Sequence, residues 1–209
     1  MTSGRFITFE GGEGAGKSTQ VRLLADALEA RGLTVVQTRE PGGAPQAELL
    51  RDLLITGDAD RWSPEAEALL NYAARDDHLR TTIRPALEAG SWVLCDRFAD
   101  STRAYQGLAG NVSMEMIDAV HEHVVGPTDP DLTLILNIAP ETGLARAHAR
   151  GDANRFEMKG LAFHQRLQQS FLELAERFSD RCVVIDASGS IEEISSAIWN
   201  AVETRLLKP

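Results

Sequence analysis

The amino-acid sequence predicts an α/β protein built on a doubly wound parallel sheet with helices on both faces. Short apolar stretches of strand character alternate with helical stretches along the whole chain of 209 residues. One of these stretches, 131–138, is apolar through most of its length, which is typical of a parallel strand buried on both faces. No internal repeat, low-complexity tract or linker divides the chain, so we expect a single domain over residues 1–209.

Each element is predicted from its own local pattern. The expected strands are short, mainly apolar runs at 5–10, 33–38, 91–96, 131–138 and 182–186. The expected helices repeat apolar residues at helical spacing and lie near 17–31, 46–56, 64–89, 113–124, 140–149, 160–179 and 190–207. Two helix starts are marked by a proline in the first turn with an acid behind it, at Pro64-Glu65 and Pro140-Glu141.

Composition narrows the classes of partner. The chain carries 21 basic against 31 acidic residues, whereas extended nucleic-acid binding needs a concentrated basic surface. No apolar run approaches the ~18 residues of a membrane span, and the N-terminus has no basic-then-apolar signal region. Cys95 and Cys182 lie in apolar stretches and are expected to be reduced core thiols. We therefore expect a cytoplasmic protein with no nucleic-acid or membrane partner.

The most specific motif is the segment GGEGAGKS at 11–18, a complete G-x-x-x-x-G-K-[ST] phosphate-binding loop. It lies between an expected strand and an expected helix, which is the context that the motif requires. The glycines let successive backbone N–H groups converge on phosphate oxygens, Lys17 reaches the β- and γ-phosphates, and the Ser18 hydroxyl ligates Mg²⁺. The predicted ATP-binding loop consists of Gly11, Gly12, Glu13, Gly14, Ala15, Gly16, Lys17 and Ser18.

Charged residues follow the ends of the expected strands, where ligands gather in sheets of this type. Asp96 ends the third strand, a position from which a carboxylate holds Mg²⁺ through water; capping a helix is its alternative role. Arg97 beside it carries a planar guanidinium that suits a phosphate monoester. Arg146, Arg150 and Arg155 follow the fourth strand through one helix. This convergence indicates an anion site in a chain whose net charge is −10.

Five further segments stand in order behind the phosphate loop: TREPGG (38–43), YAAR (72–75), DRF (96–98), STRAYQG (101–107) and PDLT (130–133). With these segments the chain resembles the bacterial thymidylate kinases over nearly its whole length. The resemblance implies transfer of the γ-phosphate of ATP to dTMP, giving dTDP and ADP for dTTP synthesis, with Mg²⁺ as cofactor. It also implies a five-stranded P-loop NTPase core with a short lid, and a cytoplasmic homodimer.

The resemblance assigns the acceptor site as well. It implies that Glu13 receives the 3′-hydroxyl of dTMP, that Arg97 binds its phosphate and that Arg75 bonds thymine O4. Gln106 carries donors and acceptors able to read the thymine imide edge, and Tyr105 matches the tyrosine beneath the deoxyribose. The implied dTMP-binding residues are Glu13, Arg39, Pro41, Arg51, Asn71, Arg75, Arg97, Ser101, Thr102, Tyr105 and Gln106.

Two of these positions carry an alternative. In the family, an aromatic ring four residues before the matching arginine stacks on the base, but this sequence has Asn71 there. Its neighbour Tyr72 points about 100° away on an ideal helix, so whether Tyr72 replaces that ring is open. Arg51 lies on an expected helix, where a solvated surface position is the alternative to binding.

The stretch 146–158 resembles the family's lid. Proteins of this kind place a catalytic arginine either in the phosphate loop or in the lid, and Gly14-Ala15 offers none in the loop. The resemblance therefore implies that the lid supplies it, with Arg155 as the first choice and Arg150 as the second. Arg146 is expected to bind ATP. The expected catalytic residues are Lys17, Arg97, Arg155 and Arg150.

Two other functions compete with this interpretation. Another nucleoside monophosphate kinase or a deoxynucleoside kinase would share the same core. A GTPase-type switch would need an Asn-Lys-x-Asp segment, whereas the fourth strand ends in Leu136-Asn137-Ile138-Ala139. The spacing of Cys and His fits no zinc site. The expected metal ligands are Ser18, in the phosphate loop, and Asp96, at the end of the third strand, both for Mg²⁺.

Overall fold

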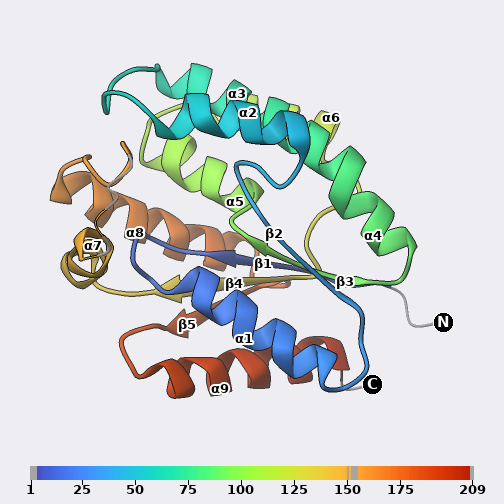
Figure 1. Cartoon of the computed structure of the whole chain (residues 1–209). Helices are drawn as coiled ribbons and strands as arrows, with labels where there is room; N and C mark the ends of the chain where they lie inside the picture. The colour runs from blue at the N-terminus through green and yellow to red at the C-terminus, as the bar shows by residue number, and fades with distance from the viewer. Residues whose placement is uncertain (1–3, 150, 152–154, 208–209) are drawn as a thin grey trace.

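The computed structural model describes residues 4–149, 151 and 155–207. At its centre lies a five-stranded, all-parallel sheet in the order β2-β3-β1-β4-β5 (Figure 1). The strands are β1 (Phe6–Glu10), β2 (Val35–Arg39), β3 (Trp92–Asp96), β4 (Leu132–Asn137) and β5 (Cys182–Asp186). The expected doubly wound α/β fold is confirmed, and all five strands lie where the apolar runs predict them.

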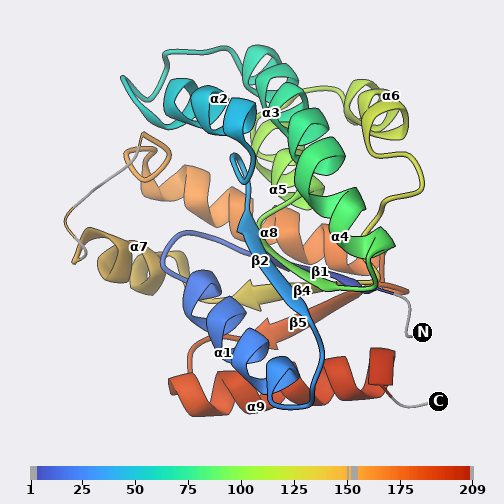
Figure 2. The ribbon, with the colours of Figure 1, turned by 45° about the vertical axis from the view of Figure 1, so that its right-hand side comes forward.

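Helices cover both faces of the sheet (Figures 1 and 2). On one face α1 (Lys17–Glu29) and α9 (Ile191–Val202) pack side by side, and their apolar residues share one core with β1 and β4. The other face carries α3 (Pro64–His78), α4 (Arg84–Glu88), α5 (Ala99–Thr102), α6 (Met114–Val124) and α8 (Leu161–Arg177). Outside this layer, α2 (Pro45–Ile55) packs on α3, and α7 (Pro140–His148) lies against the phosphate loop.

The strand register brings the functional candidates to one edge. Asp96 pairs with Phe9 of β1 on one side and with Arg39 of β2 on the other. The strands are parallel, so Glu10, Arg39 and Asp96 all end at the same carboxyl edge of the sheet. The phosphate loop leaves β1 at this edge, as ligand-binding segments do in folds of this type.

Long-range contacts account for the one helical segment that the sequence pattern did not predict. No element was expected over 99–108, yet α5 forms there and continues as a π-helical turn over Arg103–Leu108. Its start is held from a distance, because Oε1 of Glu10 accepts hydrogen bonds from the backbone N–H of Phe98 at 2.8 Å and of Ser101 at 3.2 Å. The N-terminus of α5 therefore needs no capping side chain of its own, and Phe98 at the N-cap position is not a residue that predicts the start of a helix.

The remaining helix expectations hold with small changes. The helix expected over 64–89 consists of α3 and α4, joined by a π-helical turn at Leu79–Ile83. Pro64 and Pro140 both stand in first turns, and the Ser63 hydroxyl accepts a hydrogen bond from the Ala66 N–H. Cys95 and Cys182 are free and buried. Within the described part of the chain, no helix is both long enough and apolar enough to cross a membrane.

Candidate active site

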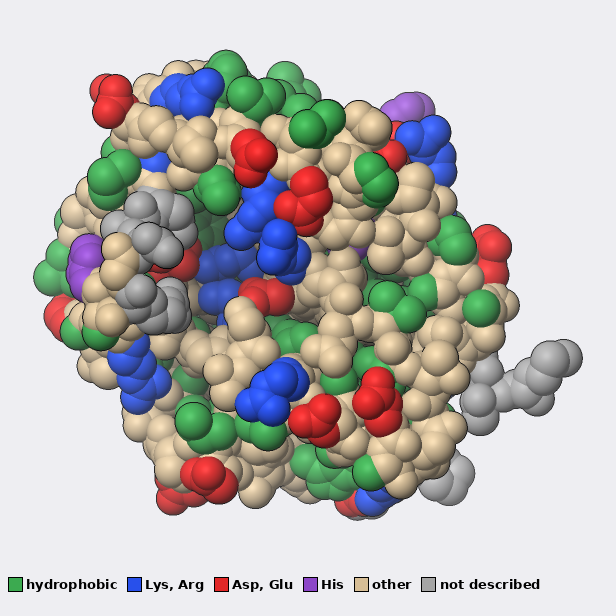
Figure 3. All heavy atoms as spheres, in the orientation of Figure 1, with side chains coloured by type: hydrophobic (Ala, Val, Ile, Leu, Met, Phe, Trp, Pro, Cys, Tyr) green, Lys and Arg blue, Asp and Glu red, His purple; other side chains and the backbone are tan. Residues whose placement is uncertain are grey.

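A cavity of about 450 Å³ opens at the carboxyl edge of the sheet. Figure 3 shows Lys and Arg side chains gathered in this hollow, although the protein as a whole is acidic. Most residues expected to bind ligands line it: Glu13, Gly14, Ala15, Gly16, Lys17, Ser18, Arg39, Pro41, Arg51, Asn71, Arg75, Asp96, Arg97, Ser101, Thr102, Tyr105 and Gln106. Segments far apart in the sequence thus meet at one site.

The phosphate loop has the backbone shape that its glycines allow. Gly14 and Gly16 have φ angles of 66° and 90°, and a Cβ at Gly14 would collide with the carbonyl of Gly143 in α7. The ammonium of Lys17 folds back on the loop and donates to the carbonyls of Gly11 at 3.2 Å and Gly12 at 2.8 Å. Burial and the nearby Arg97 charge lower the pKa of Lys17 to about 8. These contacts are ones that a bound polyphosphate would replace.

Ser18 and Asp96 form the candidate metal site. The Ser18 hydroxyl donates to Oδ2 of Asp96 at 2.5 Å, and both residues line the cavity. The Ser18 hydroxyl at the start of α1 and the Asp96 carboxylate at the end of β3 are hard oxygen donors. They fit Mg²⁺, which keeps several waters and takes further ligands from phosphates. Among the described residues, no cluster of three His, Cys, Asp or Glu could enclose a metal by itself. The donor set is therefore the kind used for a metal that arrives with a nucleotide.

Arg97 is held by three contacts at the centre of the cavity. Its guanidinium donates to Oε1 of Glu13 at 3.0 Å, to the Gly11 carbonyl at 2.9 Å and to the Ser101 hydroxyl at 3.2 Å. Its backbone φ is 70°, a left-handed conformation that costs a non-glycine residue energy and often marks functional sites. The same Glu13 oxygen accepts a hydrogen bond from the Tyr105 hydroxyl at 2.7 Å.

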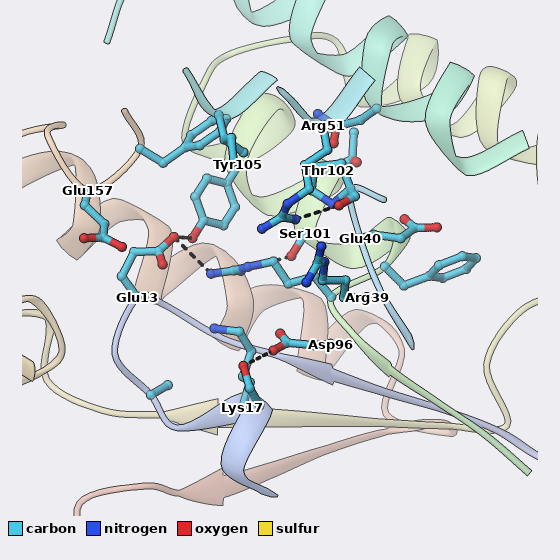
Figure 4. A pocket seen from close by; sticks show the side chains of 18 of the residues that line it. Glu13, Lys17, Arg39, Glu40, Arg51, Asp96, Ser101, Thr102, Tyr105 and Glu157 are labelled. Atoms are coloured by element: carbon cyan, nitrogen blue, oxygen red, sulfur yellow. Dashed lines mark hydrogen bonds and ion pairs between the residues drawn. The ribbon is translucent and has the colours of Figure 1, made fainter. Parts of the chain in front are cut away.

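Glu13 stays ionised in this arrangement. Burial by itself raises its pKa, but the charges of Arg97 and Lys17 outweigh burial and bring the pKa to about 2. The loop carboxylate is therefore a hydrogen-bond acceptor across the physiological range. Figure 4 shows it between the Lys17 end of the cavity and Tyr105.

Arg75 occupies the opposite end of the cavity and is almost fully fixed by its neighbours. Its Nε donates to Oε2 of Glu40 at 2.8 Å, and its Nη2 donates to the Thr102 hydroxyl at 3.1 Å. The guanidinium carbon lies 4.5 Å from the ring centroid of Tyr72 and 5.1 Å from that of Phe98. The third nitrogen, Nη1, is buried without a hydrogen-bond partner among the described residues. A buried donor of this kind favours a ligand that brings an acceptor.

Asn71 lines the cavity, whereas Tyr72 is buried in the core and does not. The amide of Asn71 donates to the Glu67 carbonyl at 2.8 Å, one turn earlier in α3. Tyr72 therefore packs against the Arg75 guanidinium and does not reach the cavity. Another aromatic ring, Phe156, lines the cavity from the lid and meets Tyr105 edge to face with ring centroids 5.7 Å apart.

Two of the three expected lid arginines, Arg146 and Arg155, are described by the structure and do not line the cavity. Arg155 is buried outside it, where its Nη2 donates to Oε1 of Glu67 at 2.6 Å and its other nitrogens donate to the carbonyls of Leu54 and Ala59. Arg146 donates to the Ala187 carbonyl at 3.4 Å. Arg150 lies outside the described residues.

On the α2 side, Arg51 lines the cavity and is not a purely solvated side chain. It donates to the Pro41 carbonyl at 2.6 Å, while Arg39 pairs with Glu48 at 3.1 Å. Gly11 and Gly12 contribute their carbonyls to Lys17 but are not lining residues of the main cavity.

Six cavity residues were not singled out by their sequence pattern: Thr19, Glu40, Ile55, Phe98, Phe156 and Glu157. Glu40 lies inside the TREPGG segment and Phe98 directly follows Arg97. The family resemblance therefore included both residues, but it implied no role for either. Phe156 and Glu157 lie in the expected lid stretch. Their contribution depends on how the chain folds back, which local spacing does not show.

A parallel sheet with this loop after β1 and a cationic cavity at its carboxyl edge defines a P-loop nucleotide-binding protein. The family model for thymidylate kinase matches residues 9–198. The chain belongs to the thymidylate kinase family.

Known proteins support this membership along the whole chain. A thymidylate kinase of Caulobacter vibrioides is 60% identical over 206 residues, with 99% of each chain covered. That of Bradyrhizobium sp. (strain ORS 278) is 53% identical, covering 97% of this chain and 91% of the relative. The crystal structure of thymidylate kinase from Ehrlichia chaffeensis superposes with a TM-score of 0.78 at 32% identity, covering 96% of this chain and 99% of that one.

Proposed function

We propose that this chain transfers the γ-phosphoryl group of ATP to dTMP, giving dTDP and ADP, with Mg²⁺ as cofactor. The observation that carries the proposal is at Arg75. This residue lines the same cavity as the phosphate loop, and its buried Nη1 has no partner among the described residues. A ring carbonyl such as thymine O4 would satisfy this donor. The relatives named above are thymidylate kinases, which supports the same acceptor.

The two substrates take opposite ends of the cavity. The base end (Glu40, Arg75, Thr102 and Gln106) receives thymine, and Asn71, Pro41 and Arg51 line the wall beside it. The donor end (Lys17, Ser18 and Asp96) receives the triphosphate (Figure 4). Between the two ends, Arg97 binds the dTMP phosphate, with Ser101 and Arg39 beside it. Glu13 accepts the 3′-hydroxyl, and Tyr105 lies beneath the sugar.

The chemistry requires positioning and charge neutralisation more than proton transfer. The nucleophile is an oxygen of the dTMP phosphate, whose second pKa of about 6 leaves it ionised at neutral pH. Arg97 holds that phosphate, and Lys17 exchanges its loop carbonyls for the transferring group. Ser18 and Asp96 would hold the magnesium ion, which would offset the negative charge of the triphosphate.

The lid completes the site in this proposal. Arg155 leaves Glu67 and turns toward the triphosphate when ATP is bound, with Arg150 as the alternative and Arg146 as a further ATP contact. An arginine that engages only on closure stabilises the transition state more than the bound substrates.

A phosphate-acceptor screen tests the proposal. With ATP and Mg²⁺ in a coupled assay, dTMP is expected to be phosphorylated far faster than dCMP, AMP or GMP, with dUMP weaker than dTMP. Chelation of the metal should stop turnover. A preference for another nucleoside monophosphate would favour the alternative, a different kinase on the same core.

The proposal extends to a cytoplasmic homodimer. Leu49, Leu53 and Leu69 are large apolar side chains exposed on α2 and α3, and Figure 3 shows hydrophobic side chains over this part of the surface. Burying them between two copies would remove apolar area from water. Light scattering coupled to gel filtration is expected to give twice the mass of the chain, and the mass of one chain would contradict the dimer.

A further inference from the structure

Glu67, near the start of α3, has no role in the site as described so far. It is buried, and its two carboxylate oxygens bond side chains from two distant segments. Oε1 accepts from Arg155, 88 residues away, at 2.6 Å, and Oε2 accepts from Nε2 of Gln106, 39 residues away, at 2.9 Å. Glu67 thus forms an ion pair with Arg155, and a carboxylate in an ion pair accepts hydrogen bonds and donates none.

This contact determines which way round the Gln106 amide lies. Because the carboxylate cannot donate, the NH₂ group of Gln106 must face Glu67. Gln106 is 3% exposed and lines the cavity, and Glu67 is the hydrogen-bond partner of its side chain within the described part of the chain. The amide oxygen and the second N–H therefore remain for a ligand. Turning the amide over would bring its oxygen against a negative charge.

We propose that Glu67 is a specificity-determining positioning residue, which fixes the Gln106 amide so that the site selects pyrimidines carrying a hydrogen on N3. This inference rests on the proposed function, in which Gln106 reads the base edge. Thymine carries N3–H and can donate to the fixed amide oxygen. Cytosine has a bare N3, so two acceptors would face each other. The rotation that would relieve this contact is the one that Glu67 opposes.

The substitution Glu67→Gln separates this role from simple support. The new side chain has nearly the same shape but carries both a donor and an acceptor, so either orientation of Gln106 can be satisfied. The binding of a base with a bare N3 should then improve relative to thymine. The 5-methyl group is read elsewhere and should not be affected.

The experiment compares equilibrium dissociation constants for dTMP, dUMP and 5-methyl-dCMP, measured by calorimetry without ATP. In Glu67→Gln, the preference for dTMP over 5-methyl-dCMP is expected to fall about tenfold, the order expected for one hydrogen bond to a charged group. The preference for dTMP over dUMP should stay within about twofold. Glu65→Gln, an exposed acid in the same first turn of α3, should change neither ratio. If Glu67→Gln weakens all three ligands equally, Glu67 is merely structural and the proposal is wrong.

Two further variants separate this proposal from the proposed function. Gln106→Leu removes the amide, so a preference for dTMP over 5-methyl-dCMP equal to that of the unsubstituted protein would refute base reading by Gln106 itself. If Gln106→Leu lowers this preference and Glu67→Gln does not, only the role of Glu67 is refuted. Arg155→Lys keeps a positive charge beside Glu67 and should leave the preference unchanged. A fall in Arg155→Lys without a fall in Glu67→Gln would assign the effect to Arg155 and refute the role of Glu67.

A measurement on the unsubstituted protein covers the case in which Glu67→Gln does not fold. The side-chain amide of Gln106, assigned in a ¹⁵N spectrum with the Gln106→Leu variant, should show one hydrogen that exchanges slowly and is shifted downfield in the free protein. If both amide hydrogens exchange fast and have the chemical shifts of an exposed glutamine, Glu67 does not hold the amide and the proposal is overturned.

Discussion

The base end and the donor end of the cavity differ in how their polar groups are paired. At the base end, Arg75 is clamped by Glu40, Thr102 and two aromatic rings, yet keeps one nitrogen without a partner among the described residues. At the donor end, the Lys17 ammonium donates hydrogen bonds to carbonyls of its own loop, and the Ser18 hydroxyl donates to Asp96. Arg155, the expected lid arginine, is paired outside the cavity.

This difference indicates two kinds of binding. A ligand at the base end meets side chains already held in place, so little ordering is needed when it binds. A ligand at the donor end must exchange existing contacts for new ones. We therefore expect substitutions at the acceptor groups to act on dTMP affinity, and substitutions at the donor groups to act on turnover.

The largest expected effect on acceptor binding belongs to Arg97. Replacing it by alanine removes a buried charged contact to the dTMP phosphate, which costs about 2–5 kcal/mol. The KM for dTMP should rise steeply while the affinity for ATP changes little, as measured by steady-state kinetics and ATP titration. Equal losses for both substrates would move Arg97 to the donor side or to a structural role.

Lys17→Ala should show the opposite pattern. The ammonium stabilises charge on the transferring phosphoryl group, so kcat is expected to fall by about 10²–10³-fold. The dissociation constant for dTMP should remain close to that of the unsubstituted protein. Near-normal turnover in a variant with an unchanged melting temperature would contradict the assignment of the phosphate loop.

Glu10 accepts hydrogen bonds from Phe98 and Ser101, next to Arg97, and its titration makes the free energy of unfolding depend on pH. Burial, and next the charge of Asp100, raise the pKa of Glu10 from 4.5 to about 7. The folded protein thus holds this proton more tightly than the unfolded chain. The associated stabilisation is fully present below pH 4.5 and is lost as the pH rises through 7.

Glu10→Gln should remove this pH dependence of the free energy of unfolding, which amounts to at most about 3 kcal/mol between pH 4.5 and pH 7. Denaturant unfolding between pH 4.5 and 7 measures it. The exposed acid Glu29, replaced by glutamine, serves as the control and should keep the original slope. An unchanged slope in Glu10→Gln would mean that another group titrates.

The smallest expected effect is at Asn71. A phenylalanine there would face the cavity and could stack on the base, a contact worth about 1–3 kcal/mol per base in single-strand binders. We expect several-fold tighter dTMP binding by titration without ATP. Weaker binding would mean that the face of the base is already covered, with the Phe156 ring, which lines the cavity, as the candidate.

Features that depend on residues close together in the sequence could be predicted from the sequence alone. The phosphate loop has all its fixed positions between a strand and a helix, and the helical phase already separated Tyr72 from Asn71. The start of α5 could not be found, because the acid that caps it lies 88 residues earlier. The contacts of Arg155 could not be predicted for the same reason, since its partner Glu67 lies 88 residues earlier, in α3. Such contacts exist only once the chain has folded.

One paired measurement on Arg155→Lys tests most directly whether the base end is built independently of the donor end. The variant keeps the charge beside Glu67 but loses the planar fork that suits a phosphate. We predict that kcat falls by about 10²-fold while the dissociation constant for dTMP, measured without ATP, stays within about twofold. If dTMP binding weakens in proportion to kcat, the two ends form one unit and the division proposed here is wrong.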